Sequence, residues 1–446
     1  MQIIPSAAML APPPSGQPPI SNLAPRDVEA LADELLAYHA HFAPLFARAE
    51  QRQWALTYLH GQLLDLERKS IEPMALSLPD GNVQALQQFI SLGAWDDRAV
   101  LKSHQQLVAD TLGDADTGVL IIDGCDFPKQ GSHSVGVARQ WCGALGKVAN
   151  CQASVVACYA SQRGYTLVDR QLYMPEKWFT PAYQQRREKC GVPSDLTFQT
   201  EPQLAWKLIE RLQSEPVLPF GWVIADEHFG NNPALLDRIA AAELYYLMEV
   251  PHDTLVWRTR PATAVPPRSG KKGRPPQRER LVADAPAPMR VDGVASDDAL
   301  RWRYYQIQEG AKGPLVAAFA FVRVVAVREG LPGPDQWLLL RRSLGERPEL
   351  KTYLSNAPAA TKETTLVRKS GMRWPVEAAI LECKSEVGMD QYEVRGWRGW
   401  HHHLTMTLLA HHFLVRERCQ LGKKSGGADG ATSAADVAGG VAQTAA

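Results

Sequence analysis

An apolar run that ends in an acid, Gly118-Val-Leu-Ile-Ile-Asp123, constrains the fold of this chain most. A short apolar run of this kind predicts a buried strand. A second run, 220–226, also ends in an acid, Asp226. Between and after these runs the patterns predict strands at 150–159, 165–174 and 244–250, and helices at 202–214 and 233–242. This order predicts an α/β fold over 113–250, with a mixed sheet flanked by helices.

The segments on either side have different periods. Residues 1–26 are rich in proline, and we expect a disordered arm. Over 27–112 apolar residues recur at helical spacing, which predicts an N-terminal helical domain. Its expected helices start near residue 27 and cover 56–66, 83–92 and 99–112.

A mostly β insertion is predicted over 251–365, because strand-like runs occur at 300–307, 315–327 and 337–341. The segment 258–280 is basic and rich in proline and glycine, which predicts a mobile loop. Two helices, 376–387 and 397–417, are expected to close the fold within 366–420. The Gly/Ala/Ser-rich segment 421–446 is expected to be a disordered tail.

Composition bounds the class of protein. Apolar residues make up 45% of the 446 residues, which excludes global disorder. The formal net charge is +0, so a surface that binds nucleic acid would have to be local. The 7 cysteines include no C-x-x-C pair, which disfavours a disulfide framework or zinc ribbon. We expect a soluble, cytoplasmic protein, because no apolar run approaches the roughly 20 residues that span a bilayer.

The chemistry rests on acids at the ends of strands. Asp123 and Asp226 end two predicted strands, and Glu377 lies on a late predicted helix. Carboxylates at neighbouring strand ends can converge, and hard oxygen ligands suit Mg²⁺. Two such ions about 4 Å apart can support phosphoryl transfer. On spacing alone, however, an aspartate after a strand is more often a turn former or a cap.

A longer motif carries more weight. The chain reads Asp123-Gly-Cys-Asp-Phe-Pro-Lys-Gln-Gly-Ser-His-Ser-Val-Gly-Val-Ala-Arg-Gln-Trp-Cys-Gly-Ala-Leu-Gly-Lys-Val-Ala-Asn-Cys-Gln152. This run resembles the signature of bacterial insertion-sequence transposases of the DDE superfamily, in the family typified by insertion sequence 701. Further stretches resemble the same family: Glu67-Arg-Lys-Ser-Ile-Glu-Pro-Met74, Lys189-Cys-Gly-Val-Pro193, Ala225-Asp-Glu-His-Phe-Gly230, Tyr353-Leu-Ser-Asn-Ala-Pro358 and Gly396-Trp-Arg-Gly-Trp-His-His-His403.

The resemblance implies an RNase H-like fold with a β insertion between Asp226 and Glu377. It implies that Asp123, Asp226 and Glu377 bind Mg²⁺, for which Mn²⁺ can substitute. Water would cleave a phosphodiester at the element's end, and the freed 3′-hydroxyl would attack target DNA. The implied partners are the element's terminal inverted repeats, target DNA and a second copy of the chain in a paired-end complex, with no membrane. Bound to DNA, the protein would be associated with the bacterial nucleoid.

Two positions depart from the wider group that this family resembles. A late motif of tyrosine, arginine, glutamate and lysine matches Arg373, Glu377 and Lys384, but Ser370 replaces the tyrosine. The resemblance implies that Arg373 and Lys384 hold phosphates near the metals. Where many relatives carry a pair of aspartates, this chain has Asp123-Gly-Cys-Asp126, which leaves Asp126 as the reserve first acid.

Helix geometry separates Glu377 from the other acids of its predicted helix. At about 100° per residue, Lys384 falls within about 20° of Glu377, whereas Glu382 and Glu386 point about 140° and 180° away. Glu377 therefore shares its face with a cation, and neither Glu382 nor Glu386 can share its metal site.

Further basic residues are candidates for DNA contact. Those after the first acid are Lys129, His133, Arg139 and Lys147, and those of the basic loop are Lys271, Lys272 and Arg274. The helical domain 27–112 is expected to bind the element's ends, using the modest supply of basic residues at or within its borders: Arg26, Arg48, Arg52, Arg68, Lys69 and Arg98.

Two groups of side chains are assigned to structure. The histidines at 401–403, 411 and 412 have no cysteine at zinc spacing, and consecutive residues on a helix point in different directions. We expect them to have structural or DNA-backbone roles. Trp141, Trp397 and Trp400 could stack on flipped bases, but packing in the core is the more common use of tryptophan.

Three functions remain open at this point. The first is an active DDE-type transposase, a metal-dependent endonuclease and DNA strand transferase. The second is a catalytically inactive, transposase-derived DNA-binding regulator, and the third is a nuclease that cuts without strand transfer. Three acids in the expected pattern favour the first.

Overall fold

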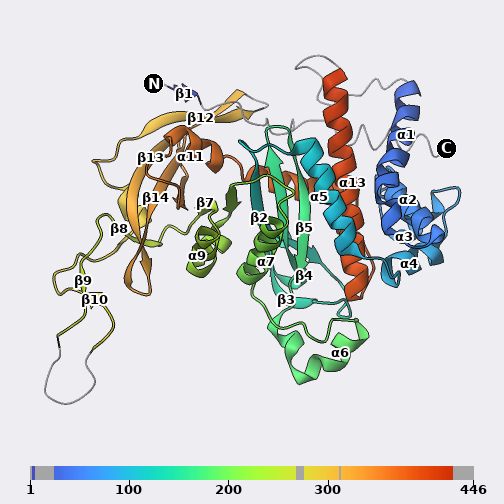
Figure 1. Cartoon of the computed structure of the whole chain (residues 1–446), viewed down its shortest axis with the longest axis horizontal. Coiled ribbons are helices and arrows are strands. Elements are labelled where there is room, and N and C mark those ends of the chain that lie inside the picture. The colour runs from blue at the N-terminus through green and yellow to red at the C-terminus, as the bar shows by residue number, and fades with distance from the viewer. Residues whose placement is uncertain (1–2, 6–24, 268–275, 311–312, 425–446) are drawn as a thin grey trace. The chain divides into compact units, whose positions relative to one another are not determined.

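The structure is a computed structural model that describes residues 3–5, 25–267, 276–310 and 313–424. The chain divides into two compact units (Figure 1). We call Gly221–Arg373, together with the N-terminal strand β1 (Ile3–Pro5), the middle unit, and Pro12–Phe220 with Trp374–Ala446 the flanking unit. Most of the expected arm and tail lies outside the described residues, although β1 and the ends of two helices are described.

Four antiparallel strands form the sheet of the flanking unit: β2 (Val119–Pro128), β3 (Ala138–Cys142), β4 (Lys147–Ser161) and β5 (Gly164–Leu172). β4 is the central strand and pairs with the other three. Residues 151–161 of β4 are all buried, as expected for a strand covered on both faces. Strands are confirmed near 118–123, 150–159 and 165–174, and β3 was not predicted. The prediction that the first strand ends at Asp123 is wrong, because β2 stays paired with β4 as far as Pro128.

The flanking unit also holds the helices α1 (Pro25–Phe42), α2 (Ala49–Leu63), α3 (Ile71–Leu76), α4 (Val83–Ser91), α5 (Asp97–Leu112), α6 (Gln184–Lys189), α7 (Glu201–Ser214), α12 (Trp374–Ser385) and α13 (Trp397–Lys424). Short 3-10 turns occur at Ala43–Leu45, Gly143–Leu145, Glu176–Phe179 and Pro181–Tyr183. The predicted helices are confirmed, whereas α3 and α6 were not expected.

The long helix α13 organises the flanking unit (Figure 1). It packs against α1, α2, α4, α5, α12 and β5. Every residue from 400 to 415 is buried, so α13 is covered all round instead of presenting one apolar stripe. The helices of 27–112 therefore do not form a compact unit of their own, because they pack around α13.

The middle unit is built on a mixed sheet. Its strands are β6 (Trp222–Ala225), β7 (Tyr245–Glu249), β8 (Leu255–Trp257), β11 (Met289–Arg290), β12 (Arg303–Gly310), β13 (Gly313–Arg328), β14 (Leu331–Ser343) and β15 (Leu350–Ser355), with β9 (Thr263–Ala264) and β10 (Arg280–Leu281) forming a separate pair. The main path runs β1-β12-β13-β14-β15-β7-β6. β6 and β7 are parallel, as are β1 and β12, and the remaining pairs are antiparallel.

The described residues of the middle unit form the helices α8 (Glu227–Gly230), α9 (Pro233–Ala241), α10 (Val291–Ala295) and α11 (Glu363–Ser370). The predicted boundary at 250/251 falls inside this unit. The unit begins at Gly221 because β7 pairs both with β6 and with β15 of the predicted insertion. Strand β15 and helix α11 were not predicted.

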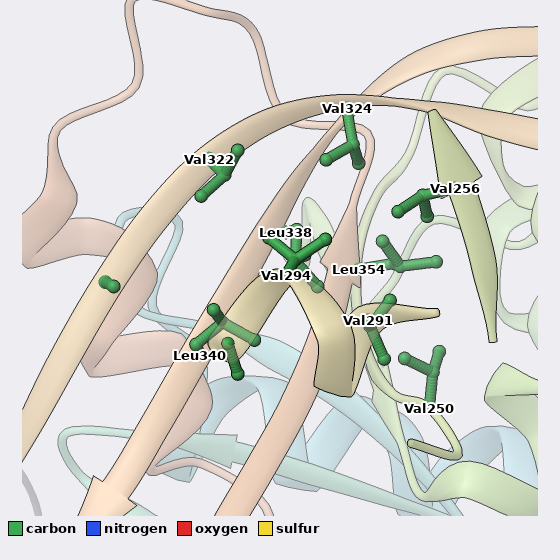
Figure 2. Packing of buried hydrophobic residues seen from close by; sticks show 11 residues of the cluster. Val250, Val256, Val291, Val294, Val322, Val324, Leu338, Leu340 and Leu354 are labelled. Atoms are coloured by element: carbon green, nitrogen blue, oxygen red, sulfur yellow. The ribbon is translucent and has the colours of Figure 1, made fainter. Parts of the chain in front are cut away.

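Alternating side chains of β13 and its neighbours fill two apolar layers. On one face, Val322, Val324 and Leu338 pack around Val291 and Val294 of α10 (Figure 2). On the other face, Phe319 and Phe321 lie in the clusters that receive Leu366 and Val367 of α11. Fully burying one such side chain contributes about 1.5–3 kcal/mol, so these layers hold both short helices in place.

Two further expectations can be compared with the structure. All 7 cysteines are free thiols, and six of them are buried. None of the helices in the described part of the chain is long and apolar enough to span a bilayer.

Candidate active site

Asp123 lies in the middle of β2, and its side chain is half-buried. The register of β2 against β4 is unbroken from Val119 to Pro128, so residues 123, 125 and 127 share one face of the sheet. Oδ1 of Asp123 accepts a hydrogen bond of 2.8 Å from the amide of Gly124. Asp126 must therefore point to the opposite face.

Helix α12 packs on β2, β4 and β5. Burial raises the pKa of Cys383 on α12 well above its usual value, and nearby Glu382, Cys125 and Cys158 add to the shift. Nζ of Lys384 lies 5.7 Å from the centroid of the Phe127 ring. Since Cys125 and Phe127 share the face of Asp123, α12 covers the face of the sheet from which Asp123 projects.

Glu377 lies in the first turn of α12 and is exposed. Leu381, one turn further on, is 67% exposed, so this side of the helix is open. The helix starts at Trp374 with Pro375 in its first turn, which leaves Arg373 just outside, as expected. The structure thus brings the strand that carries Asp123 and the helix that carries Glu377 into direct packing.

The reserve acid Asp126 has a local structural partner. Its Oδ2 accepts a hydrogen bond of 2.5 Å from the amide of Gly143, in the turn between β3 and β4. Burial raises the pKa of Asp126, while this hydrogen bond and Lys384 oppose the shift. Asp126 therefore ties β2 to the turn instead of facing α12, which favours Asp123 as the first acid.

Asp226 follows β6 in the middle unit and caps helix α8. Its Oδ1 accepts hydrogen bonds from the amides of His228 at 3.1 Å and Phe229 at 3.4 Å. The cap that spacing alone suggested is thus present, and both of its bonds use Oδ1. Among the described residues of each unit, we find no group of three or more His, Cys, Asp or Glu side chains that could hold a metal ion.

Arg373 and Lys384 flank Glu377 in sequence but belong to different units. Nζ of Lys384 donates to the backbone oxygen of Asp126 at 3.0 Å, which ties α12 to the end of β2. Nη1 of Arg373 lies 3.8 Å from Oε2 of Glu249 in the middle unit. Ser370, at the expected tyrosine position, ends α11 and uses its hydroxyl to donate to the carbonyl of Val367 at 2.7 Å.

With this geometry in place, comparison with known proteins decides the family. Residues 41–314 match the family described as DDE superfamily endonuclease. The chain belongs to this family. The matched region contains Asp123 and Asp226 and ends before Glu377.

A curated relative points the same way. The chain is similar to a probable transposase for insertion sequence element IS701 from Microchaete diplosiphon, with 30% identity over 180 residues. That alignment covers 40% of this chain and 43% of the relative, so it spans less than half of either protein.

In this member of the family, the basic residues expected to bind DNA have varied surroundings. Lys129 is half-buried, and its Nζ lies 3.4 Å from the centroid of the Tyr392 ring and donates to the Tyr392 carbonyl at 3.3 Å. Burial lowers the pKa of Lys129 to about 8, with Asp390 and Glu393 opposing the shift. This environment pins the loop after α12, and a DNA contact by Lys129 stays a prediction.

Arg139 on β3 is exposed, and Trp141, on the same face of that strand, is 65% exposed. The expectation that Trp141 packs in the core is wrong, whereas Trp400 is fully buried as expected. Lys271, Lys272 and Arg274 lie outside the described residues.

The helices of 27–112 were expected to bind DNA through their basic residues. Most of these residues make internal contacts. Arg98 pairs with Asp169 at 3.0 Å and Arg68 with Glu393 at 2.5 Å. Lys69 is buried and donates to the carbonyl of Gln62 at 3.1 Å. Because these helices cover α13, their removal would expose a core helix, so deletion of the segment is not a clean test of DNA binding.

The histidines of α13 are structural, as the sequence indicated. His401, His402 and His403 are buried, and burial lowers their pKa values to about 3, 4 and 3. His403 contacts the hydroxyl of Tyr58 at 2.8 Å, and His412 contacts that of Tyr38 at 3.1 Å. Consecutive histidines serve this helix because each one meets a different neighbour.

The sequence did not indicate the role of Glu382. It accepts hydrogen bonds from Tyr165 at 2.6 Å, Arg418 at 2.7 Å and His411 at 3.1 Å. Burial alone would raise the pKa of Glu382, but His411 and Arg418 hold it well below its usual value. Glu382 thus anchors the helix that carries Glu377 to β5 and α13. The only signal in the sequence was helix periodicity, which turns Glu382 about 140° away from Glu377 but does not show its partners.

Proposed function

We propose that the protein is a DNA transposase that cleaves phosphodiester bonds at the ends of an insertion sequence and joins the 3′-hydroxyl ends to target DNA. The observation that carries the proposal is the packing of α12 on the Asp123 face of β2 within a chain of the DDE superfamily endonuclease family. The likeness to the IS701 transposase supports the transposase reading over a nuclease without strand transfer.

In this proposal Asp123, Asp226 and Glu377 are the acids of an RNase H-like active site. Their donors fit a hard divalent cation, because each offers carboxylate oxygens. Asp123 is half-buried, Glu377 is exposed, and the α8 cap of Asp226 uses Oδ1. When bound, Mg²⁺ or Mn²⁺ would activate the attacking oxygen and stabilise the leaving one.

The remaining steps belong to the chain's own groups. The three carboxylates would hold the divalent cation, whose positive charge would offset the repulsion between these acids and the scissile phosphate. Glu382 fixes α12, and therefore Glu377, through its bonds to Tyr165 and Arg418. Lys384 ties the C-terminal end of α12 to the end of β2 and keeps its charge near the site. The same acids would serve cleavage and joining, because both are attacks by an oxygen on a phosphodiester.

We extend the proposal to its partners. The expected ligands are the element's terminal inverted repeats and target DNA, and two copies of the chain would bring two ends together. Both reactions would then proceed within one protein–DNA complex, close to the nucleoid.

The experiment first searches both sides of the gene for short inverted repeats and then uses DNA that carries them. Cleavage and joining are followed with Mg²⁺, with Mn²⁺ and with a chelator, in wild type and in Asp123→Asn and Asp126→Asn. We expect metal-dependent cleavage that Asp123→Asn removes with DNA binding retained, whereas Asp126→Asn cleaves. Binding without cleavage in wild type, under every metal condition, would instead indicate a DNA-binding regulator.

A further inference from the structure

Three segments of the flanking unit that are distant in sequence meet at one place. The amide of Val135, in the loop after β2, donates to the carbonyl of Arg395 at 2.9 Å, and the amide of Trp397 donates to the carbonyl of Cys190 at 2.8 Å. The Cys190 thiol lies 3.6 Å from the carbonyl of His133. The loop after β2, the end of α6 and the link between α12 and α13 are therefore joined by backbone contacts.

A pocket of about 320 Å³ opens where these segments meet. Its lining consists of His133, Gln185, Arg186, Lys189, Cys190, Arg395 and Gly396. Three of these side chains carry a permanent positive charge, and none is acidic. We call this feature the basic pocket.

The cations of the basic pocket lack carboxylate partners. Over the described residues, no Asp or Glu forms an ion pair with Arg186, Lys189 or Arg395. Elsewhere in the same unit an exposed arginine does find an acid, as Arg68 does with Glu393 at 2.5 Å. The nearby Glu188 accepts instead from Gln184 at 3.2 Å. The positive charge of the pocket is therefore available to a ligand.

One cation of the basic pocket, Arg186, packs against aromatic rings. The Arg186 guanidinium lies 5.2 Å from the centroid of the Tyr183 ring and 5.8 Å from that of the buried Trp178. Helix α6 ends in a tight turn in which Gly191, at φ +66°, donates to the carbonyl of Glu188 at 3.0 Å. A left-handed residue at this position favours glycine. Pre-set donors lose less conformational freedom on binding, which suits a defined anion.

We propose that the basic pocket binds a phosphodiester group of DNA through Arg186, Lys189 and Arg395. The inference rests on the proposed function, because it supplies a DNA contact for the same protein. Guanidinium and ammonium groups match phosphate oxygens, and their contacts position a strand without reading its bases. Beside the three cations, the lining leaves Gln185 and His133 to reach a base edge, so most of its contacts should be indifferent to sequence.

The test compares two charge-matched double variants of the full chain. Lys189→Gln with Arg395→Gln changes the pocket, and Arg347→Gln with Lys362→Gln removes the same charge from exposed positions of the middle unit. Binding of a duplex with the element's ends and of a random duplex is measured between low and moderate salt, with a chelator present so that no cleavage occurs.

The pocket variant should bind both duplexes about tenfold or more weakly than wild type. The slope of log affinity against log salt should fall by about 1 to 2, since each phosphate contact contributes about 0.9. The control variant should change neither quantity by as much. Equal slopes in the two variants, with both folded by circular dichroism, would overturn the inference.

Two other outcomes separate the possible failures. In the first, inorganic phosphate raises the melting temperature of wild type but not of the pocket variant, and the DNA salt slope is the same in both proteins. This result would identify a site for free anions and overturn the DNA assignment. Failure of wild type to bind either duplex would instead contradict the proposed function itself.

Discussion

Glu382 offers the sharpest test of how the candidate site is supported. Its carboxylate accepts four hydrogen bonds, two from Arg418 and one each from Tyr165 and His411, and its side chain is 13% exposed. The side chains of His411 and Arg418 are 0% and 20% exposed, so solvent screens this cluster weakly. In Glu382→Gln the charge is lost, and the new amide NH₂ group meets donors instead of acceptors.

The size of the effect follows from these contacts. A hydrogen bond to a charged group contributes about 1.5–3 kcal/mol, and removal of one partner from a buried pair costs about 3–5 kcal/mol. Glutamine can still accept from one donor, so we expect a loss of about 3 kcal/mol in the free energy of unfolding. An exposed acid of another helix, Glu210, supplies the control, because Glu210→Gln should stay within about 0.5 kcal/mol.

Urea unfolding at neutral pH measures both variants. The folded-state pKa of Glu382 is depressed, so its contribution is present above the unfolded pKa of about 4.3 and is lost as the pH falls towards the folded value. Wild type should therefore lose more stability than Glu382→Gln between about pH 5 and pH 3. Equal urea midpoints and parallel pH profiles in wild type and Glu382→Gln would refute the reasoning.

Three further substitutions test other parts of the structure. Asp169 is fully buried and pairs with Arg98 and Arg211, so Asp169→Asn should cost about 3–5 kcal/mol in urea unfolding. Leu338→Ala, in the layer beneath α10, should cost about 2–5 kcal/mol by the same assay. Trp141 is 65% exposed, so Trp141→Ala should shift the melting temperature little, and a large loss would show that its ring is buried in solution.

Much of the fold could be predicted because its signals are local. Runs such as Gly118-Val-Leu-Ile-Ile-Asp123 are apolar throughout, and they coincide with strands covered by helices. Helix α11 was missed because Thr364, Thr365 and Val367 have low helix propensity, and the burial of Leu366 and Val367 against the sheet outweighs it. Strand β15 was missed because its apolar alternation is short and weak.

The candidate site was less predictable, because tertiary partners decide the role of a charged residue. Helix periodicity correctly separated Glu377 from Glu382, since the first is exposed and the second is not. No local pattern showed that Glu382 would meet Arg418 and His411, or that Lys129 would pack on Tyr392. These pairs join segments that are far apart in the chain, so only the folded structure reveals them.

The central claim is that Glu377 completes the active site with Asp123 and Asp226. Its most direct test is the single-turnover rate of end cleavage by Glu377→Gln in Mg²⁺. Glu386→Gln is the control, and the DNA affinity of both variants is measured on the same preparations. The account predicts that Glu377→Gln binds DNA as wild type does and cleaves at least about 10³-fold more slowly, a loss of about 4 kcal/mol of transition-state stabilisation. Glu386→Gln should keep most of the wild-type rate. Wild-type cleavage by Glu377→Gln would contradict the assignment of the third acid and the motif alignment behind it.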